Sequence, residues 1–113
     1  MTDQNVTEHM RVETTVADRD SAERLARSVI EARVAACAQV TGPITSFYRW
    51  EEEVHNDQEW LVVMKGAGDR LDALTTHLLA VHPYDVPEII ATPIEGGNPE
   101  YLRWVVEETR PTE

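Results

Sequence analysis

The sequence predicts an α+β fold, namely a ferredoxin-like split βαβ sandwich with the element order βαββαβ plus a C-terminal helix. Three observations lead to this class. A strand-like alternation precedes an apolar stripe at helical spacing, two β-branched and aromatic runs suggest a hairpin, and a second helical stripe precedes another short apolar run. In this arrangement, a four-stranded antiparallel sheet carries both long helices on one face.

The first unit is expected over residues 9–34. Residues 9–16 alternate between apolar or small side chains and polar ones, which is typical of a strand. Asp18 to Ser21 supply helix-capping residues, and apolar side chains then recur at helical spacing as far as Val34.

A long hairpin is expected next. One strand runs from Ala36 to Val40, is interrupted at Thr41-Gly42-Pro43 as by a bulge or bend, and resumes over residues 44–50. Residues 51–58 are expected to form a polar turn region, and residues 59–65 the partner strand.

The second unit begins with a helix from about Asp69 to Val81, whose leucines lie on one stripe. The His82-Pro83 pair ends this helix because proline disfavours helical backbone in the residue before it. A last strand is expected within residues 88–92. Asn98 is a suitable N-cap for a third helix that extends to about Glu107.

The length of 113 residues predicts one domain, which we place at residues 9–109, with flexible tails at 1–8 and 110–113. No apolar run approaches the roughly 20 residues of a membrane helix, and the polar N-terminus does not resemble a secretory signal. We therefore expect no membrane association. A single cysteine, Cys37, fits a reducing compartment, and the expected location is cytoplasmic.

The charge balance is strongly acidic, with 10 Lys and Arg against 21 Asp and Glu and a formal net charge of -11. This balance argues against nucleic-acid binding, which needs a basic surface. It permits cation binding, although such carboxylates also serve simply to keep a protein soluble. The sequence contains no glycine-rich nucleotide fingerprint, P-loop or nucleophile elbow, and no enzymatic activity is expected.

The predicted hairpin is apolar on both faces. Trp60, Val62 and Met64 share one side of the partner strand, while Leu61 and Val63 share the other. Such a strand is normally buried on both sides, and the two helices cover only one face of the sheet. We therefore expect copies of the chain to cover the other face, where Trp60, Val62 and Met64 would otherwise be exposed to water. The alternative is that the C-terminal helix folds over it.

The densest group of reactive side chains lies between residues 82 and 88. His82, Asp85 and Glu88 could ligate a metal or act as an acid and a base. Alternatively, His82 and Tyr84 only brace the loop through bonds to the backbone, which the residues alone favour. Cys37 is expected to be a small core residue, with a soft metal ligand as the alternative. The acidic run at residues 51–57 is expected to be a solvated turn, with weak collection of hard cations as the alternative.

Several segments together resemble a known family. The segments Ala32–Ala38, Ile44–Glu51, His82–Ile90 and Tyr101–Trp104, with Lys65 after the third strand, occur in the order and spacing of the CutA-type divalent-cation tolerance proteins. The resemblance covers about residues 9 to 107. Its most specific parts are the Tyr-Arg-Trp-Glu and His-Pro-Tyr-x-x-Pro-Glu segments.

This resemblance implies a PII-like homotrimer built through the long hairpins, with no enzymatic activity and no required cofactor. The implied function is tolerance of divalent metal ions, copper above all; the alternative is a PII-like trimer that binds small molecules or anions for signalling or scaffolding. Implied metal contacts are His82 and Glu88, with Cys37 as a further candidate. The implied intersubunit ligand pocket comprises Tyr48, Trp50, Lys65, His82, Tyr84, Glu88 and Trp104.

The chain departs from one bacterial branch of the family at two positions. In that branch, a copper site uses a cysteine on the first strand and two adjacent histidines before the Pro-Tyr pair. Thr14 and Val81 occupy the corresponding positions here, so that only His82 of the three ligands is present.

Overall fold

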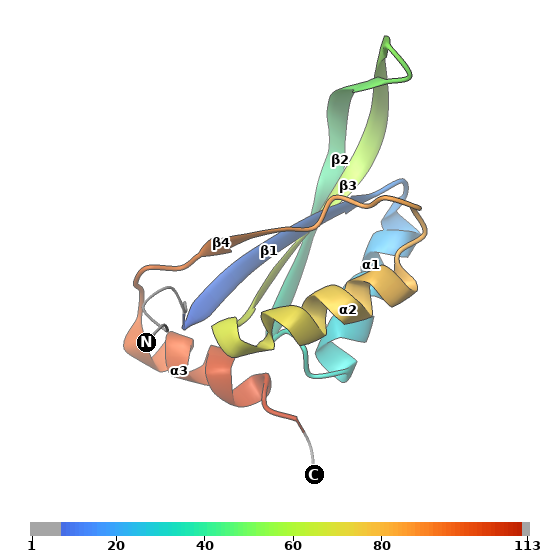
Figure 1. The fold of residues 1–113 in the computed structure, drawn as a ribbon. Coiled ribbons are helices and arrows are strands. Elements are labelled where there is room, and N and C mark those ends of the chain that lie inside the picture. The colour runs from blue at the N-terminus through green and yellow to red at the C-terminus, as the bar shows by residue number, and fades with distance from the viewer. Residues whose placement is uncertain (1–7, 112–113) are drawn as a thin grey trace.

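The computed structural model describes residues 8–111 and confirms the α+β class (Figure 1). Residues 1–7 and 112–113 of the expected tails lie outside the described residues. The elements are β1 (His9–Val16), α1 (Arg19–Glu31), β2 (Cys37–Trp50), β3 (Glu53–Ala67), α2 (Leu71–Val81), β4 (Ile90–Pro93) and α3 (Pro99–Glu108), with a 3-10 turn at Gly68–Arg70.

The four strands form one antiparallel sheet in the order β2-β3-β1-β4, as the split βαβ arrangement requires. Helices α1 and α2 pack on one face, and the β2–β3 hairpin projects beyond the rest of the sheet (Figure 1). Local signals of the sequence explain the helix starts. The side chain of Asp18 accepts a hydrogen bond from the Ser21 N–H at 2.7 Å, and that of Asn98 accepts one from the Glu100 N–H at 3.1 Å.

The hairpin is longer than the sequence predicted. Its pairing continues to Trp50 opposite Glu53, so the turn consists only of Glu51 and Glu52 rather than residues 51–58. Apart from Val54, residues 53–58 are polar because this part of the hairpin projects from the sheet and is largely exposed, not because it turns. The expected interruption is confirmed, since the β2–β3 register shifts between Thr41 and Ile44.

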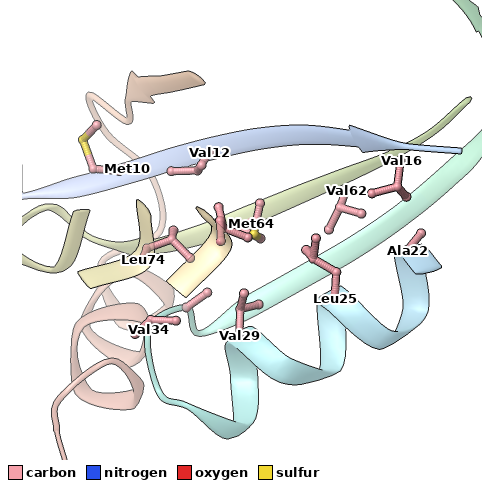
Figure 2. Close-up of a cluster of buried hydrophobic side chains, with 12 residues drawn as sticks. Met10, Val12, Val16, Ala22, Leu25, Val29, Val34, Val62, Met64 and Leu74 are labelled. Atoms are coloured by element: carbon pink, nitrogen blue, oxygen red, sulfur yellow. The ribbon is translucent and has the colours of Figure 1, made fainter. Parts of the chain in front are cut away.

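The core lies between the sheet and the two long helices. Figure 2 shows Val12 and Val16 of β1 and Met64 of β3 facing the apolar stripe of α1. Val62 and Met64 are completely buried in this core, and Trp60 packs against it. The expectation that these three side chains lie on the face left open by the helices is therefore wrong. Because side chains alternate along a strand, the open face instead carries Leu61 and Val63.

Helix α3 packs against the ends of β1 and β3. Its Val105 is buried, and the hydroxyl of the buried Thr109 donates to the Val105 carbonyl at 2.9 Å and accepts the N–H of Ala67 at 3.4 Å. The exposed aromatic residues Tyr101 and Trp104 lie on the same helix. These contacts hold α3 at one end of the sheet.

Candidate functional site

The α2–β4 loop runs past the base of the projecting hairpin (Figure 1). A groove lies between residues of this loop and of the hairpin. Its volume is about 660 Å³. We call it the hairpin groove, and it is lined by Thr15, Ser46, Phe47, Tyr48, Trp50, Asp57, Glu59, Tyr84, Asp85, Val86 and Glu88.

His82 anchors the loop that forms one wall of the groove. It is the C-cap residue of α2 and is only 9% exposed. Its Nδ1 accepts the N–H of Tyr84 at 3.1 Å, so the ring proton resides on Nε2. That Nε2 lies 3.0 Å from the Thr15 carbonyl oxygen and 2.9 Å from Thr14 Oγ1. The imidazole therefore ties the loop to β1.

Burial lowers the pKa of His82, although its bond to the Thr15 carbonyl and the charge of Glu59 act in the opposite direction. The neutral ring is thus the form that fits this site, because a protonated Nδ1 could no longer accept the Tyr84 N–H. The arrangement agrees with the interpretation of His82 as a brace. Both ring nitrogens already have protein partners, so the ring does not fit a metal without being released.

Two tyrosines connect the walls of the groove to acidic residues. The Tyr84 hydroxyl donates to Glu59 Oε2 at 2.8 Å, and the Tyr48 hydroxyl donates to Asp57. The pKa of Tyr84 is raised well above its usual range. Burial is the largest cause, and the hydrogen bond to the Glu59 carboxylate is the second. The hydrogen bond to Asp57 is the largest cause of the raised pKa of Tyr48. Both phenols therefore remain protonated donors at neutral pH.

The hairpin groove is strongly acidic. Asp57, Glu59, Asp85 and Glu88 line it, and no Lys, Arg or His is among the described residues that do so. Shielding from water raises the pKa of Glu88, and the negative charges of Glu13 and Glu59 raise it further. Carboxylates that repel one another in this way gain from a bound cation.

The structure brings together only part of the predicted pocket. Tyr48, Trp50, Tyr84 and Glu88 line the hairpin groove, and His82 contacts it only through the backbone N–H of Tyr84. Lys65 lies six residues from Glu59 along β3, which corresponds to roughly 20 Å. Trp104 on α3, Cys37 and Lys65 belong to the opposite end of the sheet.

The sequence prediction placed Asp57 only in an acidic turn and gave Glu59 no role, whereas the structure places both residues at the groove. The available signal was their spacing of two, which puts both side chains on one face of a strand. That signal was lost because Asp57 was assigned to a turn over residues 51–58, whereas Glu59 was assigned to the strand that follows.

Within residues 8–111, no three His, Cys, Asp or Glu side chains are arranged as a ready metal site. Cys37 lies next to Tyr101. Burial is the largest cause of the raised pKa of Tyr101, and the interaction with Cys37 raises this pKa further. Oxygen donors dominate the hairpin groove, and they suit hard or borderline divalent cations better than soft cuprous copper. The assignment of His82, Glu88 and Cys37 as metal ligands stays a prediction.

Across the part of the chain that the structure describes, no helix is long and apolar enough to cross a membrane.

Comparison with known proteins shows extensive similarity. Residues 10–108 match the family model "CutA1 divalent ion tolerance protein". "Divalent-cation tolerance protein CutA" of Thermus thermophilus is 43% identical over 95 residues, which is 84% of this chain and 92% of that protein. "Protein CutA 1, chloroplastic" of Oryza sativa is 47% identical over 96 residues, which is 85% of this chain but 54% of that protein. The chain thus spans about half the length of the plant relative.

Solved structures show the same similarity in three dimensions. The crystal structure of CutA1 from Oryza sativa has a TM-score of 0.89 and 43% identity, and the match covers 95% of this chain and 98% of that one. The divalent cation tolerance protein from Thermus thermophilus has a TM-score of 0.87 and 41% identity, with 90% and 99% covered.

Proposed function

The chain belongs to the CutA1 divalent ion tolerance family, and from this premise we propose that it binds or senses divalent cations such as copper, as a homotrimer. The proposed role is binding rather than catalysis. No resident cofactor is required for it, because the metal ion is the cargo or signal.

The observation that carries this proposal is the charge of the hairpin groove. Four carboxylates surround it without a neighbouring cation among the described residues that line it. The raised pKa of Glu88 reflects part of this repulsion, through Glu13 and Glu59. A divalent cation would relieve the repulsion, and carboxylate oxygens can coordinate it directly. The aromatic side chains that line the groove would reduce the contact of the bound cation with water.

The projecting hairpin supports self-association. Phe47, Trp50 and Val54 are exposed by 71%, 58% and 66%, respectively. Apolar side chains clustered on a projecting element mark an interface, because burying each large side chain contributes about 1.5–3 kcal/mol. Closed symmetry would bring the hairpin of one copy against the groove of another. Carboxylates or other donors from a second copy could then complete the coordination of the cation.

Titration calorimetry with copper(II) and zinc(II) tests the proposal. We expect binding tighter than about 1 mM, and we expect Glu59→Gln and Glu88→Gln each to weaken it about tenfold. Glu100→Gln is the matched control, because Glu100 is exposed on α3 and its substitution removes the same charge. Absence of binding to either metal, or an equal effect of all three substitutions, would contradict the proposed cation site.

Sedimentation velocity tests the assembly separately. The expected particle contains three copies of the 12.8 kDa chain at low micromolar concentration. A folded particle with the mass of a single copy would disprove the homotrimer. Trp50→Asp should shift the distribution towards smaller particles, because it places a charge at the exposed apolar end of the hairpin.

A further inference from the structure

Helix α3 is attached to the rest of the domain by little apolar surface. It lies at the end of the sheet away from the projecting hairpin (Figure 1). Of the described residues 99–110, only Val105 and Thr109 are buried. Tyr101 and Trp104 are exposed. A helix of ten residues is marginal in water on its own, so the contacts that dock α3 decide whether it forms.

The C-terminal end of α3 is held by arginine side chains. Arg33, which follows α1, donates from Nε to the Arg110 carbonyl at 2.8 Å and from Nη2 to the Glu107 carbonyl at 3.4 Å. Arg110 in turn donates two hydrogen bonds to Asp69, with its Nη1 lying 3.0 Å from Oδ2. We call Arg33, Asp69, Arg70 and Arg110 the arginine junction. It joins the end of α1, the 3-10 turn and α3.

The backbone of Arg33 is unfavourable for a residue with a side chain. Its φ angle is 59°, and it occupies the left-handed position of a Schellman motif. In this motif the N–H of Val34 bonds to the Val29 carbonyl at 3.1 Å, and the N–H of Arg33 bonds to the Ile30 carbonyl at 3.0 Å. Glycine is usual at this position because a Cβ is strained there, but glycine could not cap α3. The side chain that requires this strain is therefore the one that fastens α3.

Two features allow the arginine junction to open. The pair of Arg110 and Asp69 is exposed, with 41% and 62% of the two side chains accessible, so salt screens their attraction. Arg70 Nη2 donates to the Arg33 carbonyl at 3.3 Å, but Arg70 Nε is buried without a hydrogen-bond partner within residues 8–111. Such a donor destabilises the closed form, and water would satisfy it once the junction opens.

The arginine junction is separate from the surfaces used by the proposed function. None of its four residues lines the hairpin groove. Gly66 lies on the same face of β3 as the buried Met64, and a methyl carbon added to it would lie 3.6 Å from Thr109 Cγ2. The C-terminal end of α3 is therefore docked on the face that the helices cover, not on the open face that a homotrimer would cover.

We propose that α3 and the arginine junction form a strap that opens as one unit while the sheet, α1 and α2 stay folded. The closed strap buries Val105 and Thr109, and the open strap exposes the end of the sheet beneath them. Ionic strength controls the balance between the two forms, because salt weakens the attraction between Arg110 and Asp69. High salt therefore favours the open form.

Hydrogen exchange followed by mass spectrometry on the assembled protein tests whether the strap exists. After correction for intrinsic rates, we expect the amides of residues 101–109 to exchange together and about tenfold or more faster than those of residues 62–64 in β3. Sodium chloride at about 1 M should accelerate the α3 amides roughly threefold relative to the β3 amides. Equal protection of α3 and β3, or no relative effect of salt, would overturn the proposal.

Substitutions separate the strap from the general stability of the domain. Arg33→Gly suits the backbone angle better but loses the bonds to α3, so it should accelerate α3 exchange about tenfold and leave α1 unaffected. Asp69→Asn should accelerate α3 exchange roughly threefold and remove most of the salt effect. Arg27→Met is the matched control, because it removes an exposed arginine of α1 whose ion pair with Glu31 does not involve α3.

Arg33→Gly gives the sharpest result. If it accelerated the α3 and β3 amides equally, the arginine junction would only stabilise the whole domain, and the strap would be refuted. Slower α3 exchange would also refute it, because relief of backbone strain would then outweigh the lost bonds. Circular dichroism establishes that each variant is folded, and the wild-type comparison of α3 with β3 remains decisive if one is not. None of these outcomes depends on cation binding, so the strap and the proposed function can fail separately.

Discussion

Gly42→Ala is expected to destabilise the protein by a steric clash in the bulge of β2. A methyl carbon added to Gly42 would lie 2.6 Å from both Cδ2 and Cε3 of Trp60, and 3.0 Å from its Cγ. Carbon atoms in contact normally lie about 3.5–4.0 Å apart, so the added group overlaps the indole by about 1 Å. Relief requires either the indole or the strand to move.

The magnitude follows from how firmly the indole is held. Trp60 packs against the core, and the guanidinium carbon of Arg19 lies 5.7 Å from its ring centroid. Overpacking of this kind costs about 1–3 kcal/mol. For a domain of 113 residues, this cost lowers the melting temperature by roughly 4–12 °C.

Urea denaturation followed by circular dichroism measures the effect at a fixed protein concentration. Gly96→Ala is the matched control, since an added methyl group there meets nothing within 4 Å. The double variant Gly42→Ala with Trp60→Leu should show a favourable coupling of about 1 kcal/mol or more, because the shorter side chain removes the clash. Equal losses for Gly42→Ala and Gly96→Ala would refute the steric argument.

Two further predictions concern the turn and the loop anchor. Glu51 and Glu52 have φ angles of 51° and 69°, so replacing them with Asn-Gly should raise the free energy of unfolding by about 1–2 kcal/mol; an unchanged urea midpoint would contradict this. The folded-state pKa of His82 lies below its usual 6.5, so the unfolded chain binds this proton more readily. The stability supplied by His82 should therefore be complete above pH 6.5 and should decrease as the pH falls through the folded-state pKa. His82→Ala should flatten this slope in urea titrations, whereas His77→Ala should retain it.

The sequence predicted the elements well where local chemistry specifies them. Residues His9–Val16 form β1 as expected, because their alternation reflects one buried face. Asp18 and Asn98 cap their helices, and the His82-Pro83 pair marks the end of α2. Each of these signals acts within a few residues, so no tertiary information is needed to interpret it.

The hairpin could not be predicted as reliably because its environment is not local. Polar residues at 53–58 fit a turn and a projecting strand equally well. On β3, apolar residues occupy both faces, so the pattern alone does not reveal which face meets the helices. Burial of Val62 and Met64 answers the question, and it places Leu61 on the open face. If the face of one residue is assigned wrongly, every other side chain of the strand is placed on the wrong face of the sheet as well.

The candidate site was predictable only in part for the same reason. The Tyr84 and Glu88 positions follow from a compact loop segment whose resemblance to the family is specific. The contribution of Glu59 depends on where β3 begins, and the pairing of Arg11 with Lys65 depends on the β1–β3 register. A local sequence motif does not show which residues of two strands are paired, so contacts that depend on strand register cannot be predicted from it.

The roles of His82 and Glu88 follow from different positions relative to the hairpin groove. Glu88 lines the groove, whereas both ring nitrogens of His82 are engaged with β1 and with the backbone of its own loop. Loss of His82 would release the segment that carries Tyr84 and Glu88, so it would weaken cation binding even if no metal ever touched the imidazole. Weaker binding in His82→Ala therefore fits a positioning residue and a metal ligand equally well, and a second readout must distinguish the two roles. A ligand role for His82 would require that cation binding displace the Tyr84 N–H from Nδ1, which the amide signal of Tyr84 would report directly.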